Sequence, residues 1–555
     1  MSDVRPSPYW QAGGRTAALE RLTEHWDLIV IGGGISGAGV LLEAARQGWR
    51  CLLVEQRDFA WGTSSRSSKL VHGGLRYLKE GQFRLTLHSV RERQKLLRDG
   101  EGLIEPQRFL FPDREGCRPP RWQLGIGLAV YDWMARTRTR RHHPLAEMQE
   151  MAPGLDTTGL RGGMSYLDAK TDDARLVLRV LQEAMQAGGL AINYLPAASL
   201  VVQDGQVIGL HLVDALTSTP YVVRAKSVIS ATGVWADRLR REVGGTAKLR
   251  PLRGSHLMIA AERLPVSAAV SFSHPFDGRP VFLYPWEGVT LVGTTDVDHA
   301  ESLDSDAAIT PEETAYLMAA LHAQFPALAL DYDDVLATYA GVRPVVDSGE
   351  TDPSKAGREH IVLNENGLIT LTGGKLTTFL PMAHDALALA AAQAGKPWQK
   401  PAGSVFSSPP RLPAGLSHLQ RQRLGGRYGA ITDTVLAAAK PQELELIPGT
   451  QTSWLELRWA ARAEAVTRLE DLLLRRCRLG ILLREGGLAH IARIRSICQP
   501  ELGWDDARWE SEESAYRELI ARSYSLPPAS HLLDWHTYLQ PPAALAGDAE
   551  TPPQN

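Results

Sequence analysis

The sequence predicts an α/β fold whose parallel sheet is assembled from segments that lie far apart in the chain. Residues 28–31, 227–231 and 368–372 are short apolar runs, each followed within two residues by glycine. Apolar runs of this length between turn residues are typical of buried strands. Residues 35–46 then predict a helix and residues 50–55 another strand, so the first 30 residues of this pattern form a strand–helix–strand unit.

The composition indicates a folded protein with more than one domain. The chain has 555 residues, of which 44% are hydrophobic and 22% are charged, so a disordered or fibrous chain is excluded. Its 60 basic and 63 acidic side chains leave a net charge of −3, which argues against a nucleic-acid partner. No segment has the pattern of a secretory signal or a membrane span, so we expect a cytoplasmic protein.

The cysteines predict neither a metal site nor a disulfide framework. The four of them lie far apart, with no CxxC spacing among Cys51, Cys117, Cys477 and Cys498. Sparse, scattered cysteines are typical of proteins from a reducing compartment. We therefore expect no bound metal.

A glycine-rich turn between the first strand and its helix predicts a dinucleotide site. Residues 32–37 read GGGISG, which fits GxGxxG, and Glu55 follows where an acidic residue is expected. Gly32 permits the tight turn, Gly34 lets the backbone approach a pyrophosphate, and Gly37 lets the helix pack closely on the strand. The helix N-terminus then faces the phosphates, and Glu55 accepts hydrogen bonds from a ribose.

Two later glycine junctions favour FAD over a nicotinamide that must diffuse away. Thr232-Gly233 and Gly373-Gly374 each follow a predicted strand, and both could reach the same ligand. A large cofactor contacted by distant segments fits this arrangement better than a diffusible one.

Residues 63–78, TSSRSSKLVHGGLRYL, form a second dense motif. Its hydroxyl, cationic and glycine residues fit a polar loop beside a bound ligand, and a solvated helix entry is the alternative. With four later motifs, this window resembles the FAD-dependent glycerol-3-phosphate dehydrogenases. These motifs are Gly254-Ser255-His256, Gly293-Thr294-Thr295-Asp296, Gly341-Val342-Arg343-Pro344 and Gly373-Gly374-Lys375-Leu376-Thr377-Thr378. The resemblance covers roughly residues 25–525.

The resemblance implies both an architecture and a reaction. The architecture is a glutathione-reductase-like Rossmann FAD domain with an inserted α+β substrate domain and an all-helical C-terminal domain. The reaction oxidises sn-glycerol 3-phosphate to dihydroxyacetone phosphate, with hydride transfer from C2 to flavin N5 and electrons passed on to quinone. We see no long insertion of the kind that resembles the oxygen-using oxidases, which favours quinone. The alternatives are a glycerol-3-phosphate oxidase that uses oxygen and an FAD-dependent amine or amino-acid oxidase.

The domains follow from the same resemblance. The FAD domain is expected at residues 25–100, 165–240 and 340–395, the substrate domain at 101–164 and 241–339, and the helical domain at 418–535. Within the helical domain, residues 454–483 are apolar-periodic and predict a long helix. Residues 1–24 are expected to form a cap helix or a flexible extension, and residues 541–555 a disordered tail.

The substrate site is predicted from the charge and chemistry of a phosphate monoester. Guanidinium and ammonium groups hold such a dianion well, so we place Arg76, Arg343, Arg358 and Lys375 around it, with Tyr77 as a hydrogen-bonding partner. A surface ion pair is the alternative for each cation. The C2 hydroxyl must lose a proton, and a neutral imidazole suits this near pH 7. The catalytic candidates are His72, His256 and Arg343, with the choice of base left open.

The cofactor contacts are predicted from the glycine junctions and the hydroxyl-rich window. They are Gly32, Gly34, Ser36, Gly37, Glu55, Thr63, Ser64, Ser65, Ser67, Gly73, Thr232, Gly233, Gly374, Lys375, Leu376 and Thr377.

Residues 122–135, WQLGIGLAVYDWMA, are apolar with aromatic residues and precede four arginines. A core helix leading into a basic loop is the favoured interpretation. A helix seated on a membrane surface is the alternative, and a quinone acceptor would place the protein peripherally at the cytoplasmic face. A homodimer is left open.

Overall fold

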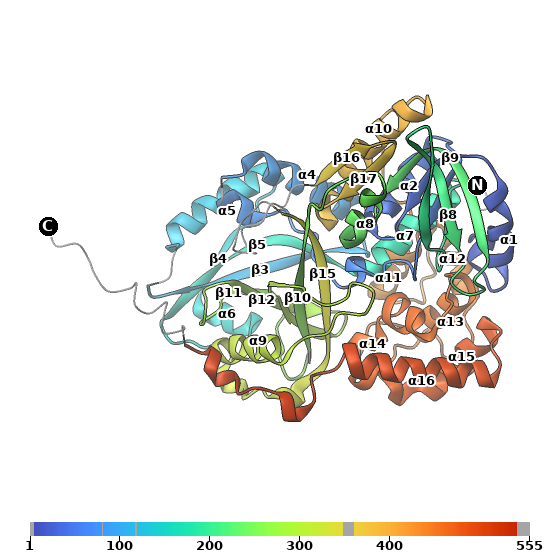
Figure 1. The fold of residues 1–555 in the computed structure, drawn as a ribbon. Helices are drawn as coiled ribbons and strands as arrows, with labels where there is room; N and C mark the ends of the chain where they lie inside the picture. Colours follow the sequence, from blue (N-terminus) through green and yellow to red (C-terminus); the bar gives the residue numbers. More distant parts are fainter. Residues whose placement is uncertain (1–4, 80, 117–118, 348–359, 541–555) are drawn as a thin grey trace.

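The computed structural model describes residues 5–79, 81–116, 119–347 and 360–540. Arg358 and the expected tail at residues 541–555 therefore lie outside the described residues. In Figure 1 the chain forms two bodies, each built on a sheet. Helices of the C-terminal part lie below the body that carries the N-terminus. Among the described helices, none is both long and apolar enough to cross a membrane.

An eight-stranded sheet carries the three predicted strands side by side. Its order is β16-β17-β9-β1-β2-β6, with β7 and β8 continuing antiparallel from β9. β1 pairs in parallel with β2 and β9, and β9 pairs in parallel with β17. The strands are β1 (Trp26–Ile31), β2 (Cys51–Val54), β6 (Leu190–Ile192), β7 (Ala197–Gln203), β8 (Gln206–Val213), β9 (Pro220–Ser230), β16 (Ile361–Glu365) and β17 (Leu368–Thr372). The predicted discontinuous parallel sheet is confirmed.

Helices pack on this sheet around one apolar core. α2 (Ile35–Arg46) contacts α7 (Asp173–Gln186) and α10 (Phe379–Ala394), and all three bury aliphatic side chains against β1 and β17. α8 (Ala236–Glu242) follows β9. α1 (Gly14–Glu20) and the turn Pro8–Trp10 lie in the N-terminal extension, where buried Trp10 donates its indole N–H to the carbonyl of Ala191. Of the two expectations for residues 1–24, the cap helix is the one present.

A nine-stranded sheet forms the second body. Its order is β14-β10-β13-β12-β11-β3-β5-β4, with β15 paired to β10. The strands are β3 (Ile104–Arg114), β4 (Arg141–His143), β5 (Leu160–Thr171), β10 (Leu249–Ala260), β11 (Ala269–Ser273), β12 (Pro280–Trp286), β13 (Val289–Gly293), β14 (Val297–Asp298) and β15 (Val335–Val346). The domain boundaries expected at residues 164/165 and 339/340 fall inside β5 and β15, each of which pairs along its length in this sheet.

Helices also surround the second sheet. α9 (Pro311–Gln324) begins with a capping box formed by Thr310 and Glu313. The others are α3 (Leu75–Lys79), α4 (Phe83–Asp99), α5 (Arg121–Ala135) and α6 (Leu145–Met151). α3, α4 and α5 contact one another, and α5 lies at the opposite end of the molecule from the N-terminus (Figure 1).

The C-terminal part is helical, as predicted, but the single long helix expected at residues 454–483 is wrong. The segment instead contains three shorter helices: α13 (Trp454–Ala463), a π-helix at Asp471–Arg476 and α14 (Leu479–Leu482). Ala465 has a left-handed backbone with φ of 51°, which ends helical propagation, and the Asp471 carboxylate accepts the backbone N–H groups of Thr467 and Arg468. The remaining helices are α11 (His418–Tyr428), α12 (Thr432–Ala437), α15 (Ile491–Leu502) and α16 (Asp506–Ser523).

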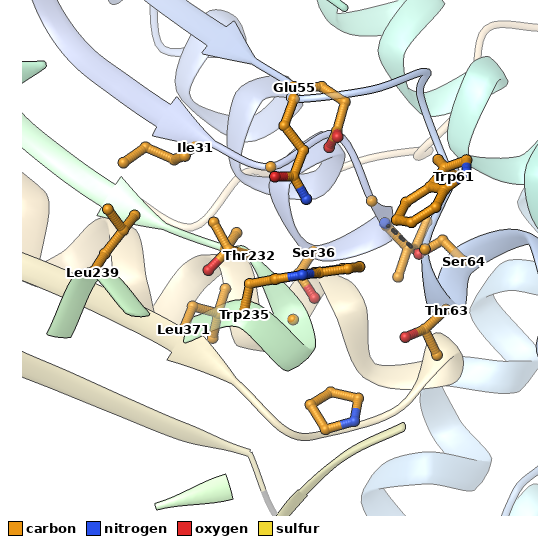
Figure 2. A pocket seen from close by; sticks show the side chains of 18 of the residues that line it. Ile31, Ser36, Glu55, Trp61, Thr63, Ser64, Thr232, Trp235, Leu239 and Leu371 are labelled. Carbon is orange, nitrogen blue, oxygen red and sulfur yellow. Dashed lines mark hydrogen bonds between the residues drawn. The ribbon is translucent and has the colours of Figure 1, made fainter. Parts of the chain in front are cut away.

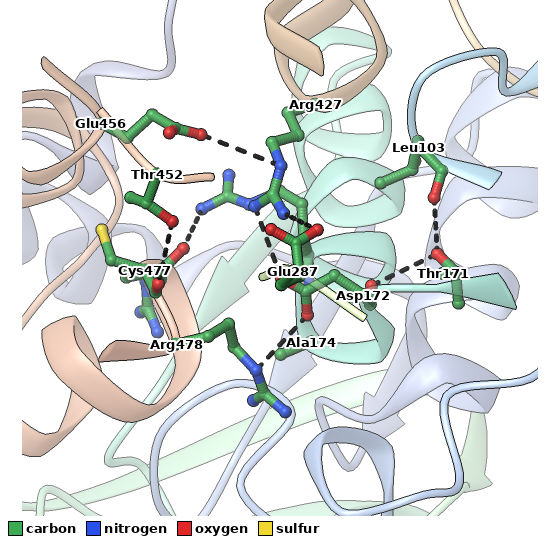
Figure 3. Close-up of polar contacts among 12 residues, drawn as sticks. Leu103, Thr171, Asp172, Ala174, Glu287, Arg427, Thr452, Glu456, Cys477 and Arg478 are labelled. Atoms are coloured by element: carbon green, nitrogen blue, oxygen red, sulfur yellow. Dashed lines mark hydrogen bonds and ion pairs between the residues drawn. The ribbon is translucent and has the colours of Figure 1, made fainter. Parts of the chain in front are cut away.

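Buried ion pairs fasten the helical domain to both sheets. Arg427 of α11 contacts Glu287 beside β12, Asp172 at the start of α7 and Glu456 of α13, as Figure 3 shows. Burial alone would raise the pKa of Glu287, but Arg423 and Arg427 lower it to about 2. Glu287 therefore stays ionised, and the pairing of charges fixes how the three parts meet.

Candidate active site

A cavity of about 430 Å³ opens at the carboxyl ends of β1, β9 and β17. Figure 2 shows side chains from these strand ends and from the loop after β2 facing it. Most of the predicted cofactor contacts line this cavity: Gly32, Gly34, Ser36, Glu55, Thr63, Ser64, Ser67, Thr232, Gly233, Gly374, Lys375 and Leu376. Ligands of open parallel sheets bind at this edge, so the position fits a dinucleotide.

The glycine turn has the close contacts that its motif requires. Gly32 has a φ of +111°, and a Cβ there would lie 2.6 Å from the carbonyl oxygen of Ala231. A Cβ on Gly37 would lie 1.9 Å from the carbonyl oxygen of Gly32, so α2 can approach β1 only because residue 37 is glycine. Gly37 thus shapes the turn from behind and does not line the cavity, whereas Gly34 lines it directly.

Glu55 closes the turn from the end of β2. Its two carboxylate oxygens accept the backbone N–H groups of Gly33 at 2.6 Å and Arg57 at 2.9 Å. Burial raises the pKa of Glu55 despite these hydrogen bonds. The carboxylate faces the cavity as an acceptor, the role expected toward a ribose hydroxyl.

The residues of the cavity fit FAD. The N-terminus of α2 and three glycine junctions from distant segments line one cavity, which suits a pyrophosphate-linked cofactor. Ser64 Oγ accepts the N–H of Ile35 at 3.0 Å and so ties the hydroxyl-rich loop to the helix start (Figure 2).

The remaining predicted cofactor residues support the loop from outside the cavity lining. Ser65 is buried, and its carbonyl oxygen accepts hydrogen bonds from Lys69 and Arg478. The hydroxyl of Thr377 donates to the carbonyl oxygen of His72 at 3.0 Å, next to Gly73. Neither they nor Gly73 line the cavity.

His256 lies on β10 and Arg343 on the neighbouring strand β15, where their register partners are Tyr339 and Leu252. His256 is buried, its Nε2 lies 2.9 Å from Ser68 Oγ, and its ring stacks on Tyr339 with centroids 4.6 Å apart. Burial, followed by the charges of Lys69 and Arg343, lowers the pKa of His256 well below its ordinary value. The imidazole is therefore neutral at pH 7, which a general base requires.

A second group forms where the glycine junction after β17 meets the hydroxyl-rich loop. The Lys375 ammonium lies 3.6 Å from the centroid of the buried Tyr77 ring, and the His72 ring lies 6.3 Å from the same ring. Lys375 also lines the cavity. Three of the predicted site residues are thus close together, and Lys375 is the one of them that lines the cavity. Arg76 belongs to α3, the helix that also carries Tyr77.

The comparisons with known proteins agree with this geometry. Residues 27–380 match the model of the FAD dependent oxidoreductase family, and residues 369–509 match that of the C-terminal domain of alpha-glycerophosphate oxidase. An aerobic glycerol-3-phosphate dehydrogenase of Staphylococcus aureus is 37% identical over 391 residues, which are 69% of either chain. The chain belongs to the FAD-dependent glycerol-3-phosphate dehydrogenase family.

Solved structures extend the similarity to nearly the whole fold. The glycerol-3-phosphate dehydrogenase of Bacillus halodurans, complexed with FAD, has a TM-score of 0.73 and 27% identity, covering 92% of this chain and 98% of that one. The FAD-bound L-alpha-glycerophosphate oxidase of Mycoplasma pneumoniae shares the fold, with a TM-score of 0.55, 18% identity and coverage of 70% and 100%. FAD is accordingly the cofactor of this family member, as predicted.

The sequence motifs missed two tryptophans that line the cofactor cavity. Trp61 and Trp235 approach each other with ring centroids 5.7 Å apart. Trp235 lies two residues after the junction Thr232-Gly233, and that position was the available signal for it. Trp61 lies in the loop between Glu55 and the hydroxyl-rich window, where no motif indicates its role.

Proposed function

We propose that this family member oxidises sn-glycerol 3-phosphate to dihydroxyacetone phosphate. The observation that carries the proposal is a neutral, buried His256 on β10, with Arg343 on the neighbouring strand β15 and Lys375 in the lining of the FAD cavity. A dianionic substrate needs such cations, and oxidation of its C2 hydroxyl needs a proton acceptor. The names of the relatives in Staphylococcus aureus and Bacillus halodurans support the same substrate.

The protein residues bind and orient the substrate. Arg343 Nη2 lies 2.6 Å from Asp296 Oδ1, so the carboxylate holds the half-exposed guanidinium in place and leaves other N–H groups for a phosphate. Lys375 supplies a further positive charge, and Tyr77 a hydroxyl group. His256 takes the proton of the C2 hydroxyl, with His72 as the second candidate. FAD, when bound, supplies the hydride acceptor at N5.

The base assignment predicts a pH profile. Because the pKa of His256 is lowered, the imidazole stays neutral until the pH falls below its ordinary value of about 6.5. We expect kcat/KM for glycerol 3-phosphate to stay level down to pH 6.5 and to fall only at lower pH. Steady-state rates with a dye acceptor measure this. In the variant His256→Gln the turnover is expected to fall about a hundredfold while FAD stays bound. A fall in kcat/KM that already begins above pH 6.5 would show that another group is the base.

We further propose quinone as the electron acceptor. Product formation tests the substrate and acceptor separately: dihydroxyacetone phosphate should accumulate with a soluble quinone, with little hydrogen peroxide in air. Peroxide formed at the rate of product would identify an oxidase. Flavin reduction by amines or amino acids, with none by glycerol 3-phosphate, would identify the rival oxidase class.

α5 offers a surface for membrane contact near this quinone chemistry. Its inner face buries Leu128 and Tyr131. Its outer face exposes three large apolar side chains, with exposed fractions of 69% for Trp122, 58% for Ile126 and 74% for Trp133. The following basic residues are exposed as well: Arg136, Arg138, Arg140 and Arg141. Aromatic and basic groups together suit an anionic bilayer surface, so we propose peripheral attachment at the cytoplasmic face.

Vesicle flotation tests this surface. The wild-type protein should float with vesicles containing anionic lipid, and the triple variant Trp122→Ser, Ile126→Ser, Trp133→Ser should stay at the bottom of the gradient. Val202→Ser with Val222→Ser is the matched control, because both valines are about half exposed on the hairpins of the other sheet. Flotation of the triple variant with wild-type yield would contradict the proposal.

Light scattering of the same preparations tests the homodimer that the sequence left open.

A further inference from the structure

The segment Lys69–Val71 is joined to β5 by one isolated antiparallel β-bridge. The N–H of Thr171 donates to the carbonyl of Lys69, and the N–H of Val71 donates to that of Ala169, both at 2.9 Å. Leu70 and Lys170 form the bridge between these hydrogen bonds. The segment leads through Gly73 and Gly74 into α3, which carries Tyr77 toward Lys375.

At Gly73 the backbone N–H is bound by a side chain instead of by the backbone of β5. The N–H of Gly73 donates to Asp168 Oδ1 at 2.9 Å, whereas the nearby carbonyl of Leu167 accepts from Arg93 Nη1 at 3.1 Å. The Asp168 carboxylate thus ends the pairing with β5 at the residue where the chain turns toward the substrate site. On the other side of that turn, Thr377 holds the carbonyl of His72.

Three more donors hold the Asp168 carboxylate, which is 1% exposed. Arg93 Nη1 donates to Oδ1 at 2.9 Å, and the hydroxyls of Tyr131 and Tyr166 lie 3.2 and 3.4 Å from Oδ2. Burial, followed by the Asp168 charge, raises the pKa of both phenols well above the ordinary value, so they remain protonated donors. A buried carboxylate with four donors has one orientation.

The space around Gly73 shows that the turn tolerates little displacement. A Cβ at this position would lie 2.2 Å from the Tyr131 hydroxyl and 2.7 Å from Val90 Cγ2. The backbone is therefore pressed against α4 and α5 while its N–H is bound by Asp168. A shift of the carboxylate must move the turn that carries Tyr77.

We propose that Asp168 is a positioning residue for the substrate: it fixes the turn at Gly73 and, through this turn, sets the place of Tyr77 against Lys375. This inference rests on the proposed oxidation of glycerol 3-phosphate. Asp168 does not line the FAD cavity, so its loss acts on substrate affinity and leaves cofactor binding intact. In Asp168→Asn one oxygen becomes an NH₂ group, which cannot accept from its donors.

The test compares Asp168→Asn with Glu183→Gln. Glu183 is also a buried carboxylate, with Arg179 Nη2 at 2.7 Å and Ser407 N at 3.0 Å, and it lies in α7 away from the turn. For flavin-loaded Asp168→Asn we expect a KM for glycerol 3-phosphate about tenfold above wild type, with kcat changed by less than about threefold. Glu183→Gln should lose comparable thermal stability and keep the wild-type KM.

Each outcome decides the proposal. A wild-type KM in flavin-loaded Asp168→Asn, or an equal rise in KM in Glu183→Gln, overturns the positioning role. If Asp168→Asn does not fold, Tyr131→Phe removes one donor and keeps the ring; its KM should rise about threefold, and an unchanged KM overturns the role. Anaerobic glycerol 3-phosphate is first added to the wild-type holoenzyme. Without flavin reduction there, the proposed function fails and this inference fails with it; with reduction there, only the inference is at stake.

Discussion

Replacing Arg343 by alanine is expected to leave FAD bound and to remove nearly all turnover with glycerol 3-phosphate. Arg343 lies on β15, the strand next to that of His256, and directly precedes Pro344, which lines the cofactor cavity. A guanidinium at this place can form two charge-assisted hydrogen bonds to a phosphate, and alanine forms none. Loss of both corresponds to a fall of about a hundredfold or more in kcat/KM. Steady-state kinetics and the flavin-to-protein absorbance ratio measure the two parts of this result.

Arg263→Ala is the matched control for this variant. Arg263 follows β10 in the same body and pairs with Asp334, as Arg343 pairs with Asp296, but its side chain is 47% exposed and far from the cavity lining. Its removal should leave kcat/KM within twofold of wild type. Normal turnover of flavin-loaded Arg343→Ala would remove Arg343 from the substrate site.

Asp58→Asn is expected to cause the largest loss of stability. Asp58 is completely buried in the loop after β2, and its carboxylate accepts hydrogen bonds from Arg475 Nε at 2.5 Å and from Arg476 Nη1 and Nη2 at 2.6 and 2.8 Å. Burial alone would raise the pKa of Asp58, but the charges of Arg476 and Arg475 outweigh it and lower the pKa. The amide leaves both guanidinium groups buried without this charge, which costs about 3–5 kcal/mol.

Urea unfolding measures this difference, with Asp506→Asn as its control. Asp506 also pairs with an arginine, Arg495 at 2.7 Å, but it is 82% exposed, so its charge is screened by water. We expect Asp506→Asn to unfold at the wild-type urea concentration and Asp58→Asn at a clearly lower one. Equal midpoints for Asp58→Asn and wild type would show that the Asp58 ion pairs add nothing measurable to stability.

The features predictable from sequence are those set by local backbone geometry. GxGxxG requires residues without Cβ at defined positions, and the contacts of Gly32 and Gly37 show the reason in each case. The capping box at Thr310 likewise depends on hydrogen bonds between two residues close in sequence, Thr310 and Glu313. The parallel sheet could be predicted because three of its apolar strands, β1, β9 and β17, are each followed within a few residues by glycine.

The features that were missed depend on contacts between distant segments. The interruption at Ala465 cannot be read from apolar periodicity, because residues on both sides stay buried in the helical domain. The extent of β5 is set by its pairing with β3, and Trp61 becomes a cavity residue only through Trp235, which is 174 positions away in the chain. Asp168 carries no motif of its own, since its role depends on donors from α4, α5 and the turn at Gly73.

The most direct test of the proposed function is anaerobic titration of the purified holoenzyme with sn-glycerol 3-phosphate. The substrate transfers two electrons to FAD, so the visible absorbance of the oxidised flavin should bleach in proportion to the substrate added. Glycine and proline, added separately as amino-acid controls, should leave the spectrum unchanged. An oxidised flavin spectrum that persists at saturating glycerol 3-phosphate would contradict the assignment of this chain as a glycerol-3-phosphate dehydrogenase.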